Sequence, residues 1–176
     1  MVDSIIENIV VTAQLHQQLP LQTLSVSIPS TEYDEQDPVL ILRFDSPKRA
    51  VIITEQGIIS CTGVTSIDQG TETIYSVIKT LQQHGIPIQD YPEVTIQNFV
   101  MTITLGKTLD LDLIARQLQP DQIIYKPNKN PWMEYLYDDK ITLLLCASGT
   151  VVCTGTSTLD HAYQAIDMLS AIDGIN

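Results

Sequence analysis

The chain contains two copies of one unit, and this internal repeat constrains the fold more than any other feature of the sequence. The segment "IENIVVTAQL" from Ile6 matches "IQNFVMTITL" from Ile96, with Asn third and Thr seventh in both. The segment "GIISCTG" from Gly57 matches "GTVVCTG" from Gly149. Both pairs are separated by about 90 residues and occur in the same order, which chance explains poorly. We therefore expect a molecule with approximate twofold symmetry.

Residues 1–88 are predicted to form the first repeat and residues 89–176 the second, within one continuous structural domain. Runs of β-branched residues with short breaks predict an antiparallel meander in each repeat. In the first strand, alternation places Asn8, Val10 and Thr12 on one face and the residues between them on the other. One of these two faces must meet the core.

The hydrophobic period changes near the end of each repeat. Apolar residues spaced at i, i+3, i+4 and i+7 predict amphipathic helices over about 67–84 and 158–173. A shorter helix is expected over 109–118. In the last helix, the apolar stripe and its stop are Leu159, Ala162, Ile166, Leu169, Ile172 and Gly174. The sequence predicts an α+β fold with helices on one face of a continuous antiparallel sheet.

Composition and charge exclude several kinds of protein. The chain has 9 Lys and Arg against 21 Asp and Glu, a formal net charge of -12, which is the wrong sign for a protein that coats nucleic acid without a specialised surface. No segment has the length and apolar character of a membrane span, and the N-terminal stretch lacks a basic signal region. We expect an intracellular protein, cytoplasmic or nuclear, that does not contact a membrane.

No catalytic or cofactor-binding constellation is visible. Cys61, Cys146 and Cys153 lack the spacing of a zinc site or a disulfide framework, and neither a P-loop nor a dinucleotide fingerprint is present. Cys61 and Cys153 are expected in the core, and Cys146 has no His nearby in sequence. Trp132 lies in an aromatic cluster and is either a core residue or a partner anchor. We expect no enzyme activity, no cofactor and no metal.

Both repeats carry a set of motifs that resembles the TATA-box-binding protein family over nearly the whole chain. These motifs are "ENIVVT" and "QNFVMT" in the first strands, and "SCTGVTS" and "VCTGTST" before the long helices. The resemblance implies a saddle made of one curved antiparallel sheet. It further implies a concave underside that opens and bends the minor groove, and convex helices that meet other initiation factors.

Carried over position by position, the resemblance also implies which side chains face DNA. The matching positions are Asn8, Val10, Arg43, Thr62, Asn98, Val100, Val152 and Thr154. Without the resemblance, the two asparagines would be interpreted as turn formers at strand ends. The phenylalanines that the family wedges between base steps are replaced at Asp37 (or Pro38, if one residue is deleted before it), Thr54, Asn130 and Cys146. Family positions that hold phosphates are replaced at Ile58, Thr65, Leu136, Thr150 and Ser157.

These departures leave two functions open. In the first, the chain is a TATA-box-binding-protein-like module, linked by resemblance to transcription initiation. Its minor-groove bending is lost or strongly weakened, DNA binding is weak, and a protein partner is favoured. In the second, the chain is a working general initiation factor that binds A·T-rich promoter DNA through the saddle underside. The loss of phosphate contacts favours the first function, because each contact contributes to affinity through counterion release.

Overall fold

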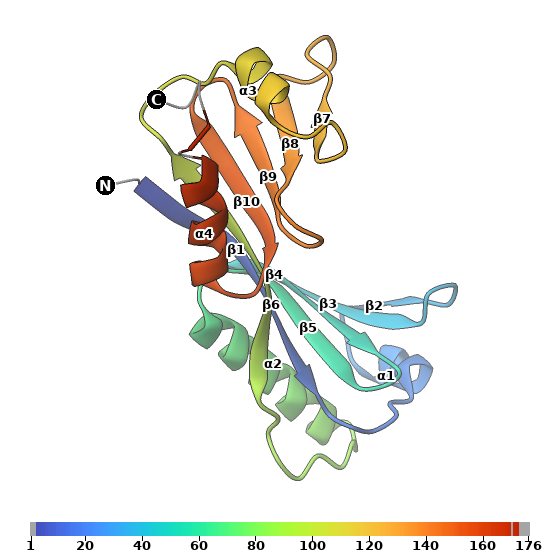
Figure 1. Ribbon diagram of the computed structural model, residues 1–176. Helices are drawn as coiled ribbons and strands as arrows, with labels where there is room; N and C mark the ends of the chain where they lie inside the picture. Colours follow the sequence, from blue (N-terminus) through green and yellow to red (C-terminus); the bar gives the residue numbers. More distant parts are fainter. Residues whose placement is uncertain (1–2, 170, 173–176) are drawn as a thin grey trace. The chain divides into compact units, whose positions relative to one another are not determined.

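The order strand, helix, four strands, helix occurs twice in the computed structural model, which describes residues 3–169 and 171–172 (Figure 1). The first copy consists of β1 (Asp3–Gln14), α1 (Leu21–Ser27), β2 (Thr31–Asp34), β3 (Val39–Asp45), β4 (Lys48–Thr54), β5 (Ile58–Val64) and α2 (Ile67–Gln83). The second copy consists of β6 (Val94–Thr104), α3 (Leu111–Gln117), β7 (Ile123–Tyr125), β8 (Trp132–Leu136), β9 (Thr142–Cys146), β10 (Thr150–Thr156) and α4 (Leu159–Leu169). The predicted internal repeat is confirmed.

The chain divides into two compact units. The N-terminal unit is Asn8–Gln97, and the C-terminal unit is Met1–Glu7 together with Asn98–Asn176. In the N-terminal unit the strands follow the order β2-β3-β4-β5-β1, and in the C-terminal unit the order β6-β10-β9-β8-β7. Neighbouring strands within each order are antiparallel. Each unit therefore has the same meander, as the repeat predicts.

The core of the N-terminal unit lies between the sheet and α2. Ile9, Val11 and Ala13 are buried, which confirms the alternation predicted for the first strand. Ser66 caps α2 by accepting a hydrogen bond from the Gln69 backbone N–H at 3.2 Å, as expected for a helix start. A Cβ at Gly70 would lie 2.4 Å from Val11 Cγ2, so α2 approaches β1 too closely for any larger residue.

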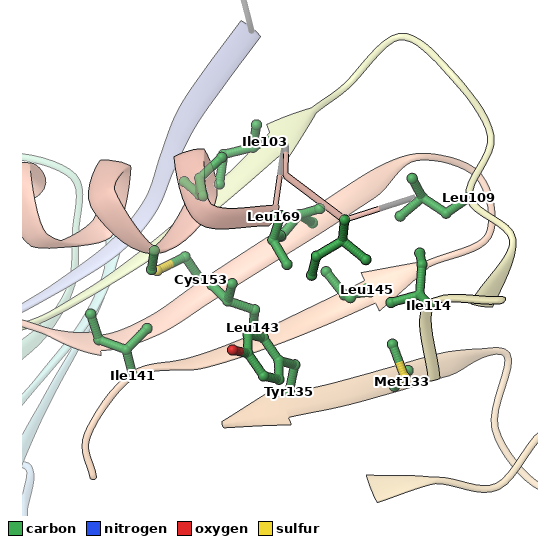
Figure 2. Packing of buried hydrophobic residues seen from close by; sticks show 14 of the residues in the cluster. Ile103, Leu109, Ile114, Met133, Tyr135, Ile141, Leu143, Leu145, Cys153 and Leu169 are labelled. Carbon is green, nitrogen blue, oxygen red and sulfur yellow. The ribbon is translucent and has the colours of Figure 1, made fainter. Parts of the chain in front are cut away.

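The core of the C-terminal unit is built by alternate residues of β6, β8, β9 and β10 and by buried residues of α3 and α4 (Figure 2). Met133 and Leu143 are fully buried there, as are Ala162 and Leu169 of the predicted helical stripe. Leu159 is a correction to that stripe, because it is the first residue of α4 and remains 36% exposed. The predicted stop at Gly174 lies outside the described residues. The predicted helix over 158–173 is too long, since α4 spans Leu159–Leu169 and residues 171–172 form a turn and a bend with hydrogen bonds to the residues three before them.

Two further expectations can be compared with the structure. The short second-repeat helix begins at Leu111 rather than Leu109, because Asp110 accepts the Leu113 N–H at 3.0 Å and acts as the cap. Cys61 and Cys153 are both buried, as predicted. Burial raises the pKa of the Cys153 thiol to about 11 and raises that of Cys61, so neither thiol is poised for reaction.

Candidate functional site

In the N-terminal unit, alternate strand residues that do not enter the core share one face of the sheet, which we call the N-terminal open face. Cross-strand register aligns Thr12 with Ser60, Ser60 with Ile52, and Ile52 with Ile41. The face comprises Asn8, Val10, Thr12, Gln14, Val39, Ile41, Arg43, Ala50, Ile52, Thr54, Ile58, Ser60 and Thr62. All are partly or fully exposed, so this surface is available to a ligand.

The C-terminal unit has an equivalent surface, which we call the C-terminal open face. Register aligns Val100 with Thr154, Thr154 with Thr142, and Thr142 with Leu136. The face comprises Asn98, Val100, Thr102, Trp132, Glu134, Leu136, Thr142, Leu144, Cys146, Thr150, Val152 and Thr154. Every DNA-facing residue predicted from the resemblance lies on one of these two faces.

The two predicted asparagines make the same hydrogen bonds in the two units. Asn8 Oδ1 accepts the Gly63 N–H at 2.8 Å, and Asn8 Nδ2 donates to Thr62 Oγ1 at 3.0 Å. Asn98 Oδ1 accepts the Gly155 N–H at 2.8 Å, and its Nδ2 donates to Thr154 Oγ1 at 3.1 Å. We call each set an Asn-Thr-Gly brace. Both asparagines lie inside strands, so they are not turn formers at strand ends.

The brace determines which way each amide points. A backbone N–H can only donate, so the amide oxygen must face the glycine and Nδ2 must face away from it. Each Nδ2 has two hydrogens and gives one to threonine. In each unit the second amide hydrogen remains as a donor on the open face.

Glycine is required at both braces. Gly63 and Gly155 have φ of +86° and +96°, and a Cβ there would lie 2.6 Å from Lys48 O and 1.8 Å from Lys140 O respectively. This close approach places the exposed residues Lys48 and Lys140 beside equivalent braces. No sequence motif points to these lysines, because the approach depends on the pairing of separate strands.

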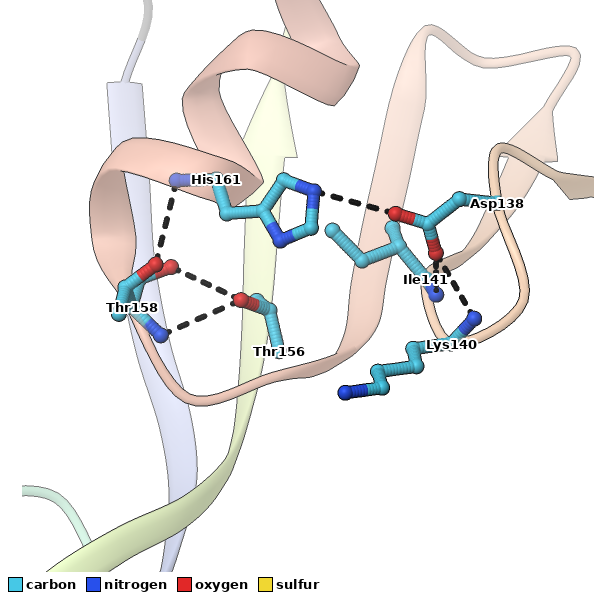
Figure 3. Close-up of polar contacts among 6 residues, drawn as sticks. All are labelled: Asp138, Lys140, Ile141, Thr156, Thr158 and His161. Atoms are coloured by element: carbon cyan, nitrogen blue, oxygen red, sulfur yellow. Dashed lines mark hydrogen bonds and ion pairs between the residues drawn. The ribbon is translucent and has the colours of Figure 1, made fainter.

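The turn that carries Lys140 is held by Asp138 (Figure 3). Asp138 Oδ1 accepts the backbone N–H groups of Lys140 at 2.8 Å and Ile141 at 2.7 Å. Asp138 Oδ2 lies 3.1 Å from Nε2 of His161 near the start of α4. These hydrogen bonds, the one from Ile141 above all, lower the pKa of the Asp138 carboxyl. The lysine is therefore presented by a fixed turn.

Arg43, the retained basic position, is paired on its own face. Arg43 Nε lies 2.8 Å from Glu32 Oε1, and Nη2 donates to Glu32 Oε2 at 3.1 Å, a bidentate pair. The hydrogen bonds from Arg43 lower the pKa of Glu32. On the C-terminal open face, Glu134 is the one charged side chain among the strand residues that we assign to it. Both faces are thus nearly neutral.

The replaced wedge positions separate into two groups. Thr54 and Cys146 lie at strand ends on the open faces, where Thr54 Oγ1 accepts the Ile58 N–H at 3.2 Å. Asp37 lies in the turn before β3 and Asn130 in the turn before β8. None of the four has an aromatic ring. The faces instead expose aliphatic groups, with Ile52 at 37%, Ile58 at 39% and Leu136 at 39%.

Other chemistries find no support in the described residues. Within 3–169 and 171–172, no three His, Cys, Asp or Glu side chains are grouped as metal ligands. In the same part of the chain, no helix has the length and apolar character needed to cross a membrane. Cys146 is partly exposed and free.

The open faces have the chemistry of a minor-groove surface. In the minor groove, A·T pairs present only acceptors, whereas guanine adds an amino donor. The free amide hydrogen of each brace can donate to the acceptors of an A·T pair. At a G·C pair it faces the guanine amino group, which is itself a donor and cannot accept it. Valine and isoleucine side chains on the N-terminal open face, and valine and leucine side chains on the C-terminal open face, add apolar surface to the faces that carry the braces.

Comparisons with known proteins identify the family of the chain. The family described as Transcription factor TFIID (or TATA-binding protein, TBP) matches residues 3–84 and 93–172. TATA-box-binding protein 1 of Haloferax volcanii is 37% identical over 166 residues, covering 93% of this chain and 88% of that protein. The TATA-box-binding protein of Archaeoglobus fulgidus is 34% identical over 167 residues, covering 94% and 91%.

The structure of Methanococcus jannaschii TBP is similar over 98% of both chains, with a TM-score of 0.85 and 34% sequence identity. This likeness confirms the predicted α+β, TATA-box-binding-protein-like fold. The family whose model matches the chain is described as a transcription factor. The chain belongs to the TATA-binding protein family.

Proposed function

We propose that this protein is a transcription initiation factor that binds A·T-rich promoter DNA through its two open faces. The observation that carries the proposal is the Asn-Thr-Gly brace, which is present in both units with matching distances. Relatives that cover nearly all of the chain are called TATA-box-binding proteins. This support favours the second of the two functions left open by the sequence over a loss of DNA binding.

Each repeat, residues 1–88 and 89–176, would contribute one brace to the bound duplex. Asn8 and Asn98 donate to base acceptors, assisted by Thr62 and Thr154. Val10, Val100 and Val152 contact sugars and base edges. A protein with this role acts inside the cell, where the genome is, together with other proteins of the transcription machinery.

The amount of bending follows from the replaced wedges. Wedging between base steps costs a few kcal/mol of unstacking, which the bent DNA offsets by covering more protein surface. Thr54 and Cys146 offer small side chains at the strand ends, and Asp37 and Asn130 lie in turns. We propose that the duplex is bent less than it would be by four aromatic wedges.

Phosphate contacts would come from few groups. Lys48 and Lys140 are exposed beside the braces, whereas Arg43 is paired with Glu32. Two phosphate contacts give a salt slope of about -1.8 in log K against log salt. The affinity would then fall only about 12-fold between 50 and 200 mM salt.

The test is fluorescence anisotropy of labelled A·T-rich and G·C-rich duplexes, with the double variant Asn8→Asp and Asn98→Asp. Aspartate keeps an acceptor for the glycine N–H but replaces the donor with a negative oxygen. We expect preference for the A·T duplex in the parent protein and a loss of affinity of more than about 100-fold in the variant. Val26→Ala is the matched control, because Val26 is 87% exposed on α1.

Equal affinity of the parent for both duplexes, or an unchanged affinity of the double Asp variant, would contradict the proposal. A parent protein that binds neither duplex would favour the other function, in which the open faces bind protein. The observation in favour of that second candidate is the combination of exposed Ile52, Ile58 and Leu136 with nearly neutral faces.

A further inference from the structure

The C-terminal open face ends at an aromatic side chain that the DNA-facing set does not include. Trp132 is the first residue of β8, and the next residue, Met133, is fully buried. Alternation therefore places Trp132 on the open face together with Glu134 and Leu136. Its side chain is partly exposed, so it is not a core residue. The sequence contains no other tryptophan.

Trp132 lies directly opposite Cys146 in the β8–β9 register. The equivalent pair in the N-terminal unit is Val39 opposite Thr54. The two pairs occupy the same place in the two repeats, at the start of one strand and the end of the next. An aromatic ring is thus present at this edge of one unit and absent from the same edge of the other.

The surroundings of Trp132 favour contact with an apolar or aromatic ligand surface. The strand residues of the C-terminal open face include no Lys or Arg in the described chain, and Leu144 and Val152 add aliphatic area. No described residue forms a ring pair or a side-chain hydrogen bond with Trp132. The indole ring therefore remains available for contact with a ligand.

Aromatic side chains stack on the bases of single-stranded nucleic acid, where each stacked base contributes about 1–3 kcal/mol, and this value sets the scale for contact with an unstacked base of a duplex. Apolar side chains at a minor groove also enter partly opened base steps. We propose that Trp132 contacts a base at one end of the bound site, so that aromatic contact with DNA is made by the C-terminal unit alone. This inference rests on the proposed DNA-binding function and adds a residue to it.

The single tryptophan makes the test direct. An unlabelled A·T-rich duplex is titrated into the parent protein while intrinsic tryptophan emission is followed, and anisotropy of a labelled duplex measures binding independently. We expect binding to quench or shift the emission with the same midpoint as the anisotropy curve. Trp132→Ala should weaken binding by about 5- to 150-fold. Trp132→Phe should restore most of the affinity, because a ring that can stack is kept.

Val26→Ala is the control, because Val26 is 87% exposed on α1 and belongs to neither open face, and it should leave the affinity unchanged. Placing 2-aminopurine at each position of the duplex in turn should give one position whose emission depends on Trp132. Urea denaturation of each variant shows whether it folds. If Trp132→Ala does not fold, the change in tryptophan emission of the parent protein on adding duplex tests the inference instead.

The outcomes separate the two claims. Binding by anisotropy with unchanged tryptophan emission, together with an unchanged affinity of Trp132→Ala, would overturn the inference and leave the DNA-binding function intact. Absence of binding by anisotropy would overturn the proposed function and this inference with it. Emission changes that follow binding, with a loss of affinity in Trp132→Ala, would support both.

Discussion

Replacing Glu32 with Gln should strengthen DNA binding by releasing the charge of Arg43. In the structure Glu32 holds the guanidinium of Arg43 through two contacts, at 2.8 and 3.1 Å. Both side chains are more than half exposed, so the pair contributes little to stability and its loss leaves the fold intact. The variant changes the electrostatics of the N-terminal open face and little else.

The size of the effect follows from counterion release. One additional phosphate contact steepens the slope of log K against log salt by about 0.9. The counterion-release contribution to the affinity vanishes at 1 M salt. Relative to that reference, the gain in affinity is about 15-fold at 50 mM salt and about 4-fold at 200 mM salt. The gain should therefore itself depend on salt, which a change in packing would not produce.

The assay is an anisotropy titration of A·T-rich duplex at several salt concentrations between 50 and 400 mM. The double variant Glu32→Gln with Arg43→Gln is the control and should return to the parent slope, because both charges are gone. Arg43→Gln alone leaves Glu32 facing the phosphates and should weaken binding. A Glu32→Gln protein with the parent slope would refute the reasoning, since Arg43 would then lie too far from any phosphate.

Three other outcomes are expected from the brace and its surroundings. Asn98→Ala removes the acceptor of the Gly155 N–H and should lower the free energy of unfolding by about 1–3 kcal/mol in urea denaturation, with faster hydrogen exchange of that amide. Gly155→Ala should cost about 2–5 kcal/mol, because a Cβ would lie 1.8 Å from a backbone oxygen, whereas Gly85→Ala meets nothing within 4 Å and should cost about 1 kcal/mol. Asp138 has a lowered pKa in the folded state, so its contribution to stability is present above 3.8, the usual value, and disappears as the pH falls through the folded value. Asp138→Asn should thus destabilise the protein at pH 6 and lose this effect in acid, and an equal difference at both pH values would contradict the assignment.

The repeat made much of the fold predictable from sequence. Two copies of one pattern support each other, so the strand alternation at Asn8 and the burial of Cys61 and Cys153 follow from residue order alone. The exposure of Leu159 does not follow, because a helical stripe contains no information on how far the first residue of the helix is covered. Local pattern predicts faces, and tertiary packing decides how far each face is covered.

The site was predictable only in part, for a related reason. The position of Asn8 and Asn98 on the sheet follows from alternation, but the amide orientation depends on glycines more than 50 residues away along the chain, at 63 and 155. The pairing of Arg43 with Glu32 depends on which residues of β2 and β3 lie opposite each other. This register cannot be predicted from the residues of either strand alone. Lys48 and Lys140 approach the braces through strand pairing in the same way. Long-range register is the information that a single sequence lacks.

The duplicated brace has a consequence for the direction in which DNA is read. Two donors of the same geometry form the same hydrogen bonds with the duplex in either orientation, because A·T and T·A pairs present the same acceptors in the minor groove. Polarity on a promoter must then come from residues that differ between the repeats. Two features are asymmetric in this way and can tell upstream from downstream. Trp132 lies where the N-terminal unit has Val39. Arg43 pairs with Glu32 on the N-terminal open face, whereas the strand residues of the C-terminal open face include no Lys or Arg.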